Sequence, residues 1–245
     1  MARFSAPTSL RLLAFLSLAL LLLTSAFAAP KPPKGVTPEK ILYKSIGGID
    51  LYLHVFRPTT SSSGKAPAIV FFHQGGWRSG RPQSFFGQAY HFATKGFVGI
   101  SAEYVVTDLA RKCLSSRPPR SRPFVALHSF PRYRIRNNWP GTKIPWDCIE
   151  DGKSAIRFLR QNAARFNIDP NKIVAGGASA GGHVAAATAS IEGSNARSDD
   201  TSVSAIPNAL VLFCPVYDTG PSGYGMYCTL SGRHLLTQHA YSRNS

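Results

Sequence analysis

The stretch IVAGGASAGGHVAAATAS, residues 173–190, decides the fold. Its first residues are apolar, as in a short buried strand, and its last nine are mostly small residues that suit a helix. Between them lies Gly177-Ala178-Ser179-Ala180-Gly181, a G-x-S-x-G pattern whose glycines relieve crowding where Cβ atoms would clash. We therefore predict a strand over 172–175, a helix over 182–190 and a tight turn that lifts the Ser179 hydroxyl above the sheet edge.

Outward from this stretch, apolar runs with strand spacing alternate with segments of helical spacing. This order predicts an α/β fold: a mostly parallel sheet with helices on both faces. The expected elements are an antiparallel pair (41–45 and 51–56, around Gly47-Gly48), strands at 68–72, 98–104 and 209–215, and helices at 84–94 and 147–166. Gly96 is placed to end the first of these helices. Cys148 falls in a helix and Cys214 in a strand, and no disulfide pairing follows from the sequence.

A second glycine-rich segment, His73-Gln74-Gly75-Gly76-Trp77, follows the apolar run AIVFF at 68–72. Two consecutive glycines can present backbone N–H groups to a substrate oxygen with no side chain in the way, as in an oxyanion hole. The alternative is an ordinary turn after a strand. Paired with the Ser179 turn, the oxyanion hole is the interpretation we adopt, and His73 is expected to hold the loop.

The chain has 245 residues and a formal net charge of +16. Much of this excess lies in loops: residues 105–132 contain six basic residues and one Asp, in a proline-rich stretch. A nucleic-acid-binding surface more often combines basic and aromatic residues on a regular element, so we expect no nucleic-acid partner.

The N-terminus has the pattern of an export signal. Arg3 and Arg11 precede an uncharged apolar run at residues 12–23. This run is followed by Ala26-Phe27-Ala28, which has the A-x-A pattern of a signal-peptide cleavage site. We expect residues 1–28 to be a signal peptide and 29–40 a linker, and the protein to be secreted or periplasmic, with no membrane association after cleavage. An uncleaved anchor is the alternative, although the run is shorter than the roughly 20 residues of a membrane span.

The segments HQGGW (73–77) and GGASAGGH (176–183) together resemble the α/β-hydrolase superfamily, in particular the hormone-sensitive-lipase-like esterases and the BD-FAE-like secreted bacterial esterases of carbohydrate acyl groups. The family's oxyanion motif is H-G-G-G-[FW], and Gln74 stands here at its first glycine. Further resemblance lies in 96–104, 133–163 and 208–225, within an expected hydrolase domain over 41–225.

The resemblance implies a serine esterase that hydrolyses small acyl esters, such as acetyl or feruloyl esters of plant polysaccharides. Ser179 would be the nucleophile, and the amides of Gly75, Gly76 and Ala180 would bind the oxyanion. No metal or organic cofactor is implied, and the partner is a small-molecule or carbohydrate ester. The oligomeric state is left open.

Two segments depart from the family pattern. Residues 105–132 form an atypical insertion, either a lid near the site or the product of an intron or a shifted frame. The resemblance ends near Gly225, and the tail 226–245 contains no acidic residue, so we expect a chain that lacks the family's last strands with their Asp and His. A catalytically impaired hydrolase or a binding protein is therefore the alternative function.

A triad from the residues present is a further alternative. Asp218 follows the strand at 209–215, and His234 and His239 come later, in the order Ser…Asp…His. The competing interpretation places Asp218 in a turn and both histidines in a loose tail. His183, one turn into the helix after Ser179, is expected to pack beside the turn.

Overall fold

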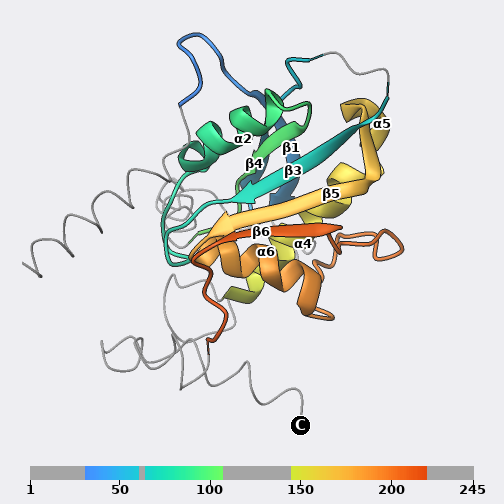
Figure 1. Cartoon of the computed structure of the whole chain (residues 1–245). Helices are drawn as coiled ribbons and strands as arrows, with labels where there is room; N and C mark the ends of the chain where they lie inside the picture. Colours follow the sequence, from blue (N-terminus) through green and yellow to red (C-terminus); the bar gives the residue numbers. More distant parts are fainter. Residues whose placement is uncertain (1–30, 61–63, 107–144, 220–245) are drawn as a thin grey trace, which may run out of the picture.

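A six-stranded sheet organises the part of the chain that the computed structural model describes, residues 31–60, 64–106 and 145–219. The strand order is β1-β2-β4-β3-β5-β6 (Figure 1). The strands β3, β4, β5 and β6 run parallel to one another, whereas β2 is antiparallel to both β1 and β4. The bounds are β1 Glu39–Ile46, β2 Ile49–Phe56, β3 Ala66–Phe72, β4 Val98–Ala102, β5 Ile168–Ala178 and β6 Ala209–Phe213. The mostly parallel α/β sheet predicted from the sequence is confirmed.

The hairpin of β1 and β2 turns at Gly47-Gly48, as predicted. Both glycines have positive φ, 58° and 82°, the conformation that a two-residue hairpin turn requires and that side chains disfavour.

Alternate residues of β3 enter two separate apolar cores, which explains its continuous apolar run. Ala68, Val70 and Phe72 face one core, which also contains buried residues of α4 (Pro145–Gln161) and α6 (Ala180–Ser190). Ile69 and Phe71 face the other, beneath η1 (Pro82–Phe85) and α2 (Phe86–Ala93). Figure 1 shows α2 on one face of the sheet and α4 and α6 on the other.

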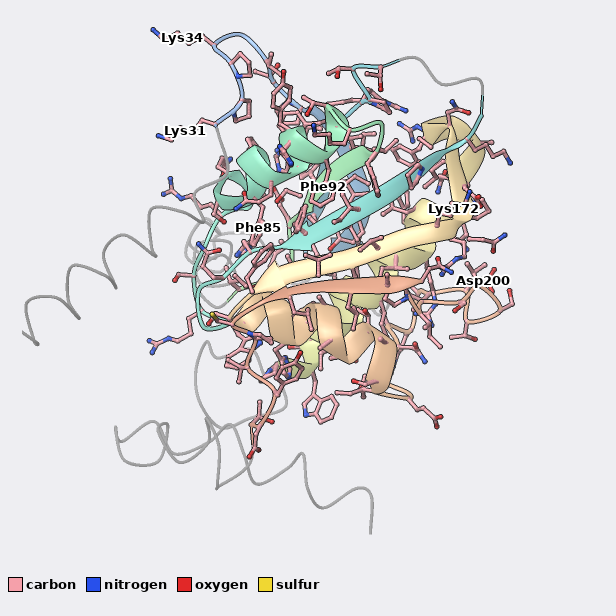
Figure 2. The ribbon with its side chains drawn as sticks, viewed as in Figure 1. Lys31, Lys34, Phe85, Phe92, Lys172 and Asp200 are labelled. Atoms are coloured by element: carbon pink, nitrogen blue, oxygen red, sulfur yellow. The ribbon has the colours of Figure 1, made fainter. Side chains whose placement is uncertain are left out.

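The core under α2 is built largely of aromatic rings. Phe71 stacks on Phe85 with ring centroids 5.0 Å apart, and Phe92 lies 5.9 Å from Phe71. In Figure 2, Phe85 and Phe92 lie between α2 and the sheet. Helix α2 stops at Ala93, and Gly96 follows with φ 87° and donates to the carbonyl of Ala93, so the predicted end of this helix is confirmed.

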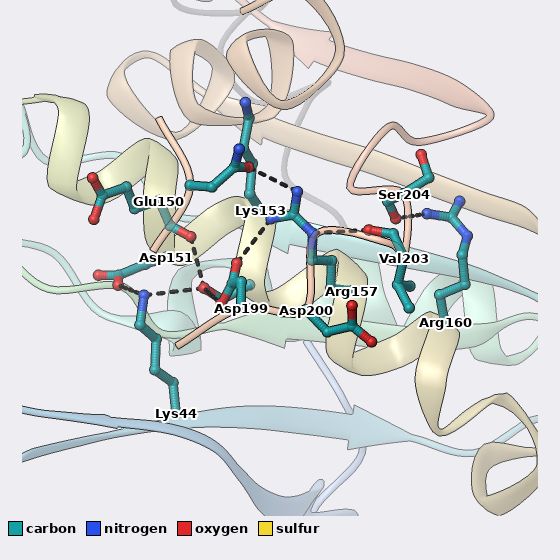
Figure 3. Close-up of polar contacts among 12 residues, drawn as sticks. Lys44, Glu150, Asp151, Lys153, Arg157, Arg160, Asp199, Asp200, Val203 and Ser204 are labelled. Carbon is teal, nitrogen blue, oxygen red and sulfur yellow. Dashed lines mark hydrogen bonds and ion pairs between the residues drawn. The ribbon is translucent and has the colours of Figure 1, made fainter. Parts of the chain in front are cut away.

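On the face of the sheet covered by α4 and α6, a buried polar network joins β1 and α4 to the loop between α6 and β6 (Figure 3). Lys44 Nζ of β1 lies 2.7 Å from Asp151 Oδ1 of α4 and 3.0 Å from Ser154 Oγ. Ser154 Oγ donates to Asp199 Oδ1, and Arg157 contacts the other Asp199 oxygen at 2.8 Å. Both charged pairs are more than nine-tenths buried, so the network is satisfied internally and not by water.

Helix α4 also anchors the end of α6. Lys153 Nζ donates to the carbonyl oxygens of Ile191 and Gly193, each at 2.6 Å, directly after the last residue of α6.

Several elements differ from the sequence predictions. Strand β5 spans Ile168–Ala178 where a strand over 172–175 is predicted, and the helix predicted over 84–94 is η1 followed by α2. The predicted helix 147–166 is two helices, α4 and α5 (Ala163–Phe166), and α5 ends where Asn167 adopts φ 54°. Strand β6 was expected to be buried, but it is exposed or half-exposed because it lies at the edge of the described sheet. Cys214 follows β6 and is not part of it; it is exposed with φ 43°, whereas Cys148 is buried in α4, where its thiol donates to the carbonyl of Val105 at 3.4 Å.

The expected signal peptide (1–28), most of the insertion (107–132), the tail (226–245) and the cysteines Cys113 and Cys228 lie outside the described residues. Within the described ranges, none of the helices has the length and apolarity needed to cross a membrane.

Candidate active site

Ser179 lies at the sharp turn between β5 and α6 and is partly exposed. Its backbone has φ 51° and ψ −117°, a combination that residues with a side chain rarely adopt. Its N–H donates to the carbonyl of Phe213 (3.1 Å), and its carbonyl accepts from the N–H groups of His183 (3.0 Å) and Val216 (3.2 Å). The strained turn is therefore fixed by β6, by α6 and by the segment that follows β6.

The glycines of the motif allow the turn to approach the end of β3. A Cβ on Gly181 would lie 2.1 Å from the carbonyl oxygen of Phe72 and 2.5 Å from that of His73. A Cβ on Gly177 would lie 2.7 Å from the same Phe72 oxygen. These distances are too short for any side chain, so glycine is required where α6 begins.

Residues 73–80, which we call the glycine loop, follow β3 directly. Gly75 and Gly76 have φ 137° and 61°, and the Gly75 carbonyl accepts from the N–H groups of Arg78 and Ser79, each at 3.1 Å. The N–H groups of Gly75 and Gly76 donate to no acceptor among the described residues. Ala180 is the first residue of α6, so its N–H has no acceptor within the helix. These are the three amides that the sequence analysis assigns to the oxyanion hole.

Two aromatic contacts hold the glycine loop. Tyr104, just after β4, stacks on the His73 ring with centroids 4.3 Å apart and donates its hydroxyl to the His73 carbonyl at 2.6 Å. Trp77, buried with φ 58°, meets the ring of His183 edge-on at 5.2 Å. His73 and His183 therefore both act in packing, in agreement with their expected positions in the loop and beside the turn.

Burial sets the ionisation of these groups. It lowers the pKa of His183 to about 4, and Nδ1 of this ring has no hydrogen-bond partner among the described residues. Burial also lowers the pKa of His73, an effect that the hydrogen bond to the Gln74 carbonyl opposes. The pKa of Tyr104 is raised well above 10 by burial, so its hydroxyl remains a donor.

Among the described residues, no acidic or histidine side chain contacts Ser179 as a triad partner would. Asp218 is exposed, two residues after Val216, whose N–H contacts the Ser179 carbonyl. His234 and His239 lie outside the described residues. No described side chain hydrogen bonds to the Ser179 hydroxyl. Within the described ranges, no three His, Cys, Asp or Glu side chains gather as metal ligands would.

Sequence reasoning did not single out Tyr104 or Trp77 as members of the site. Trp77 belongs to the quoted HQGGW segment, but its positive φ and inward side chain have no local signature. Tyr104 lies 31 residues from His73, so only the parallel pairing of β3 with β4 brings the two rings together.

Comparison with known proteins identifies the relatives of this arrangement. The BD-FAE family model matches residues 131–210. An AB hydrolase superfamily protein of Schizosaccharomyces pombe is 30% identical over 133 residues, which cover 54% of this chain and 30% of that protein. Endo-1,4-beta-xylanase B of Butyrivibrio fibrisolvens is 38% identical over 76 residues, 29% of this chain and 12% of the xylanase. The chain thus spans less than a third of the length of either curated relative.

Among solved structures, the fold is similar to esterase 2 of Thermogutta terrifontis. The butyrate-bound form has a TM-score of 0.62 and 32% identity, and the match covers 86% of this chain and 67% of the esterase. The form phosphonylated by cyclosarin has a TM-score of 0.60 and 34% identity, with 80% and 61% coverage. The sheet, the strained serine turn and these relatives agree: the chain belongs to the α/β-hydrolase superfamily, within its BD-FAE-like esterase family.

Proposed function

We propose that the protein is a serine esterase that hydrolyses small carboxylic esters, with Ser179 as its nucleophile. The observation that carries the proposal is the backbone of Ser179: a strained conformation, held by three hydrogen bonds, at the turn where β5 meets α6. Such strain persists only where the surrounding structure enforces it, and nucleophilic serines of this fold occupy such a turn.

In the proposed reaction, the Ser179 oxygen forms a bond to the ester carbonyl carbon while its proton passes to a base. The carbonyl electrons move onto oxygen, and the amides of Gly75, Gly76 and Ala180 stabilise that oxyanion. Collapse of the tetrahedral intermediate breaks the bond to the alcohol, which leaves with the proton, and water then releases the acid by the reverse sequence. Each oxyanion donor contributes about 3 kcal/mol to such a step in typical enzymes.

The base and its carboxylate partner are assigned by sequence order. Asp218 with His234 or His239 is the combination that this chain offers. Asp218 lies close in sequence to Val216, which contacts the Ser179 backbone, and this supports its candidacy.

The acyl group of the substrate is proposed from the relatives. Esterase 2 of T. terrifontis has been solved with butyrate and with propionate bound, which supports a short acyl chain. The xylanase relative supports an ester carried on a plant polysaccharide, such as an acetyl or feruloyl group. The signal-like N-terminus supports action outside the cytoplasm.

A second candidate function is a binding protein with little or no turnover. It is favoured by one observation: the Ser179 hydroxyl has no basic or acidic hydrogen-bond partner among the described residues. A serine hydroxyl without a general base is a weak nucleophile.

The test is hydrolysis of p-nitrophenyl acetate by the wild type, by Ser179→Ala and by Ser190→Ala. Ser190 is a matched control because it is an exposed serine at the other end of α6, bonded only to the Ala186 carbonyl. We expect Ser179→Ala to lose activity by roughly 10³-fold or more, and Ser190→Ala to retain it within about twofold.

Labelling with a fluorophosphonate separates the two candidate functions. The esterase proposal expects the label on the peptide that contains Ser179, in the wild type and in Ser190→Ala only. Turnover that survives Ser179→Ala would reject Ser179 as the nucleophile, and a folded wild type with neither turnover nor label would favour the binding protein.

A further inference from the structure

The carbonyl group of His73 is the point at which the glycine loop meets the rest of the site. On one side it accepts the Tyr104 hydroxyl at 2.6 Å. On the other side it lies against Gly181, where an added Cβ would be only 2.5 Å away. A movement of this carbonyl would therefore change how the glycine loop sits against the turn that carries Ser179.

The residues on both sides of Tyr104 have hydrogen-bonded backbone N–H groups. The N–H of Glu103 donates to the carbonyl of Tyr52 at 2.9 Å, and the N–H of Val105 donates to Asp151 Oδ2 at 2.9 Å. Asp151 in turn pairs with Lys44 in the buried network. The backbone on either side of Tyr104 is thus hydrogen-bonded, to β2 on one side and to α4 on the other.

Two contacts join Tyr104 to His73, and they have different roles. The ring stack, with an interplanar angle of 17°, fills space and would be kept by phenylalanine. The hydroxyl bond fixes the direction of the His73 carbonyl, and both residues are at least 98% buried, so water does not replace it. Only Gln74 separates His73 from Gly75, so this carbonyl is close in the chain to the amides of Gly75 and Gly76.

We propose that Tyr104 is a positioning residue for the esterase reaction: its hydroxyl orients the His73 carbonyl and so holds the Gly75 and Gly76 amides at the oxyanion. The inference rests on the proposed function, because positioning an oxyanion hole matters only if an oxyanion forms. Among the described residues, Tyr104 makes no hydrogen bond or ring contact with Ser179; its side chain contacts His73 and Phe72.

The test compares Tyr104→Phe with Tyr90→Phe in the full chain. Tyr90 is a control for removal of a tyrosine hydroxyl: it is half-buried on α2, its ring lies 5.9 Å from that of Phe56, and among the described residues it makes no hydrogen bond or ring contact with the glycine loop or with residues 103–105. Removing the Tyr104 hydroxyl should lower kcat for p-nitrophenyl acetate by roughly 10- to 100-fold, counted per site titrated with fluorophosphonate, with KM within about twofold. Tyr90→Phe should keep kcat within about twofold.

Two further readouts separate positioning from a general loss of structure. A trifluoromethyl ketone, which forms a tetrahedral adduct with the serine, should bind Tyr104→Phe more weakly by about the factor lost in kcat. The amide resonances of Gly75 and Gly76 should shift in a ¹⁵N–¹H spectrum of Tyr104→Phe and stay in place in Tyr90→Phe.

The outcomes are distinct. Unchanged Gly75 and Gly76 resonances in Tyr104→Phe would overturn the positioning role, whatever the activity. Shifted resonances with unchanged kcat would overturn its importance for the reaction. A wild type without Ser179-dependent turnover would instead refute the proposed function and, with it, the role of Tyr104 in catalysis.

Discussion

His183 is a buried imidazole whose surroundings favour its neutral form. It lies four residues after Ser179, edge-on to the Trp77 ring, and its backbone N–H bonds the Ser179 carbonyl. Because burial lowers its pKa to about 4, well below the ordinary value near 6.5, the ring is neutral wherever the protein is folded and the pH is above about 5.

This shift predicts an acid-sensitive stability. Well above pH 6.5 neither the folded nor the unfolded protein protonates this ring, so it contributes no penalty. Between about pH 6.5 and pH 4 the unfolded chain binds a proton that the folded chain does not, so the free energy of unfolding falls, by about 3 kcal/mol in total. Below about pH 4 both states are protonated and the loss stops growing.

Urea unfolding near pH 7 and near pH 4 measures the effect. His183→Gln should lose about 3 kcal/mol less than the wild type over this range, whatever its stability at neutral pH. His91→Gln, at an exposed position of α2, serves as the control for replacing a histidine by glutamine. Equal slopes for wild type and His183→Gln would contradict the assignment.

At the scale of elements, the site depends on how closely α6 approaches β3. The first turn of α6 presents Gly181 to the carbonyl oxygens of Phe72 and His73, and Gly182 to Pro215, where a Cβ would lie 2.8 Å from the proline Cβ. The helix is thus held between the ends of β3 and β6, and no larger residue fits without moving the Ser179 turn.

Gly181→Ala tests this packing. The added methyl meets backbone oxygens that cannot rotate away, so we expect a loss of about 3 kcal/mol in unfolding free energy, together with loss of fluorophosphonate labelling at Ser179. Gly64→Ala is the control, since an added Cβ there meets nothing within 4 Å; its stability should change by less than about 0.5 kcal/mol. Wild-type stability in Gly181→Ala would show that α6 can move without cost.

Local patterns predicted most of these elements because their signals are short in range. In three segments the local residues alone explain the structure: the Gly47-Gly48 turn, the apolar run of β3 and the glycines around Ser179. Exposure of β6 could not be predicted, since its apolar residues resemble those of a central strand and only its place at the sheet edge distinguishes it. For the same reason the pairs Tyr104–His73 and Trp77–His183 escaped prediction: each joins segments brought together only by the fold.

At the scale of the whole molecule, the buried network ties together parts that the sheet alone does not join. Lys44 comes from the antiparallel hairpin, Asp151 from α4 and Asp199 from the loop before β6. Asp151 also accepts the N–H of Val105, next to Tyr104. The network therefore connects the outer hairpin with the support of the glycine loop.

Removing the charge of Lys44 alone should lower the free energy of unfolding more than removing the charges of both Lys44 and Asp151. Lys44→Met leaves the Asp151 carboxylate buried without its cation, and we expect a loss of about 3–5 kcal/mol in unfolding free energy. In Lys44→Met/Asp151→Asn the charge is gone while an oxygen remains for Val105, so at least half of that loss should be regained. Urea unfolding of the wild type, both single variants and the double variant measures the coupling, and strictly additive losses would contradict it.

The contact of Lys153 with the C-terminal end of α6 bears on the helix dipole, whose positive end lies beside Ser179. The ammonium group lies on the carbonyls of Ile191 and Gly193 and compensates the partial negative charge of the helix terminus. At the opposite terminus, beside Ser179, the first turn holds no acidic residue to cancel the partial positive charge. The charge of the helix is thus compensated at one end only, and the other end lies at Ser179, where the proposed reaction would turn a neutral ester into an anion. Such a field discriminates by charge and not by shape, so it favours the reacting state over any substrate that merely fits.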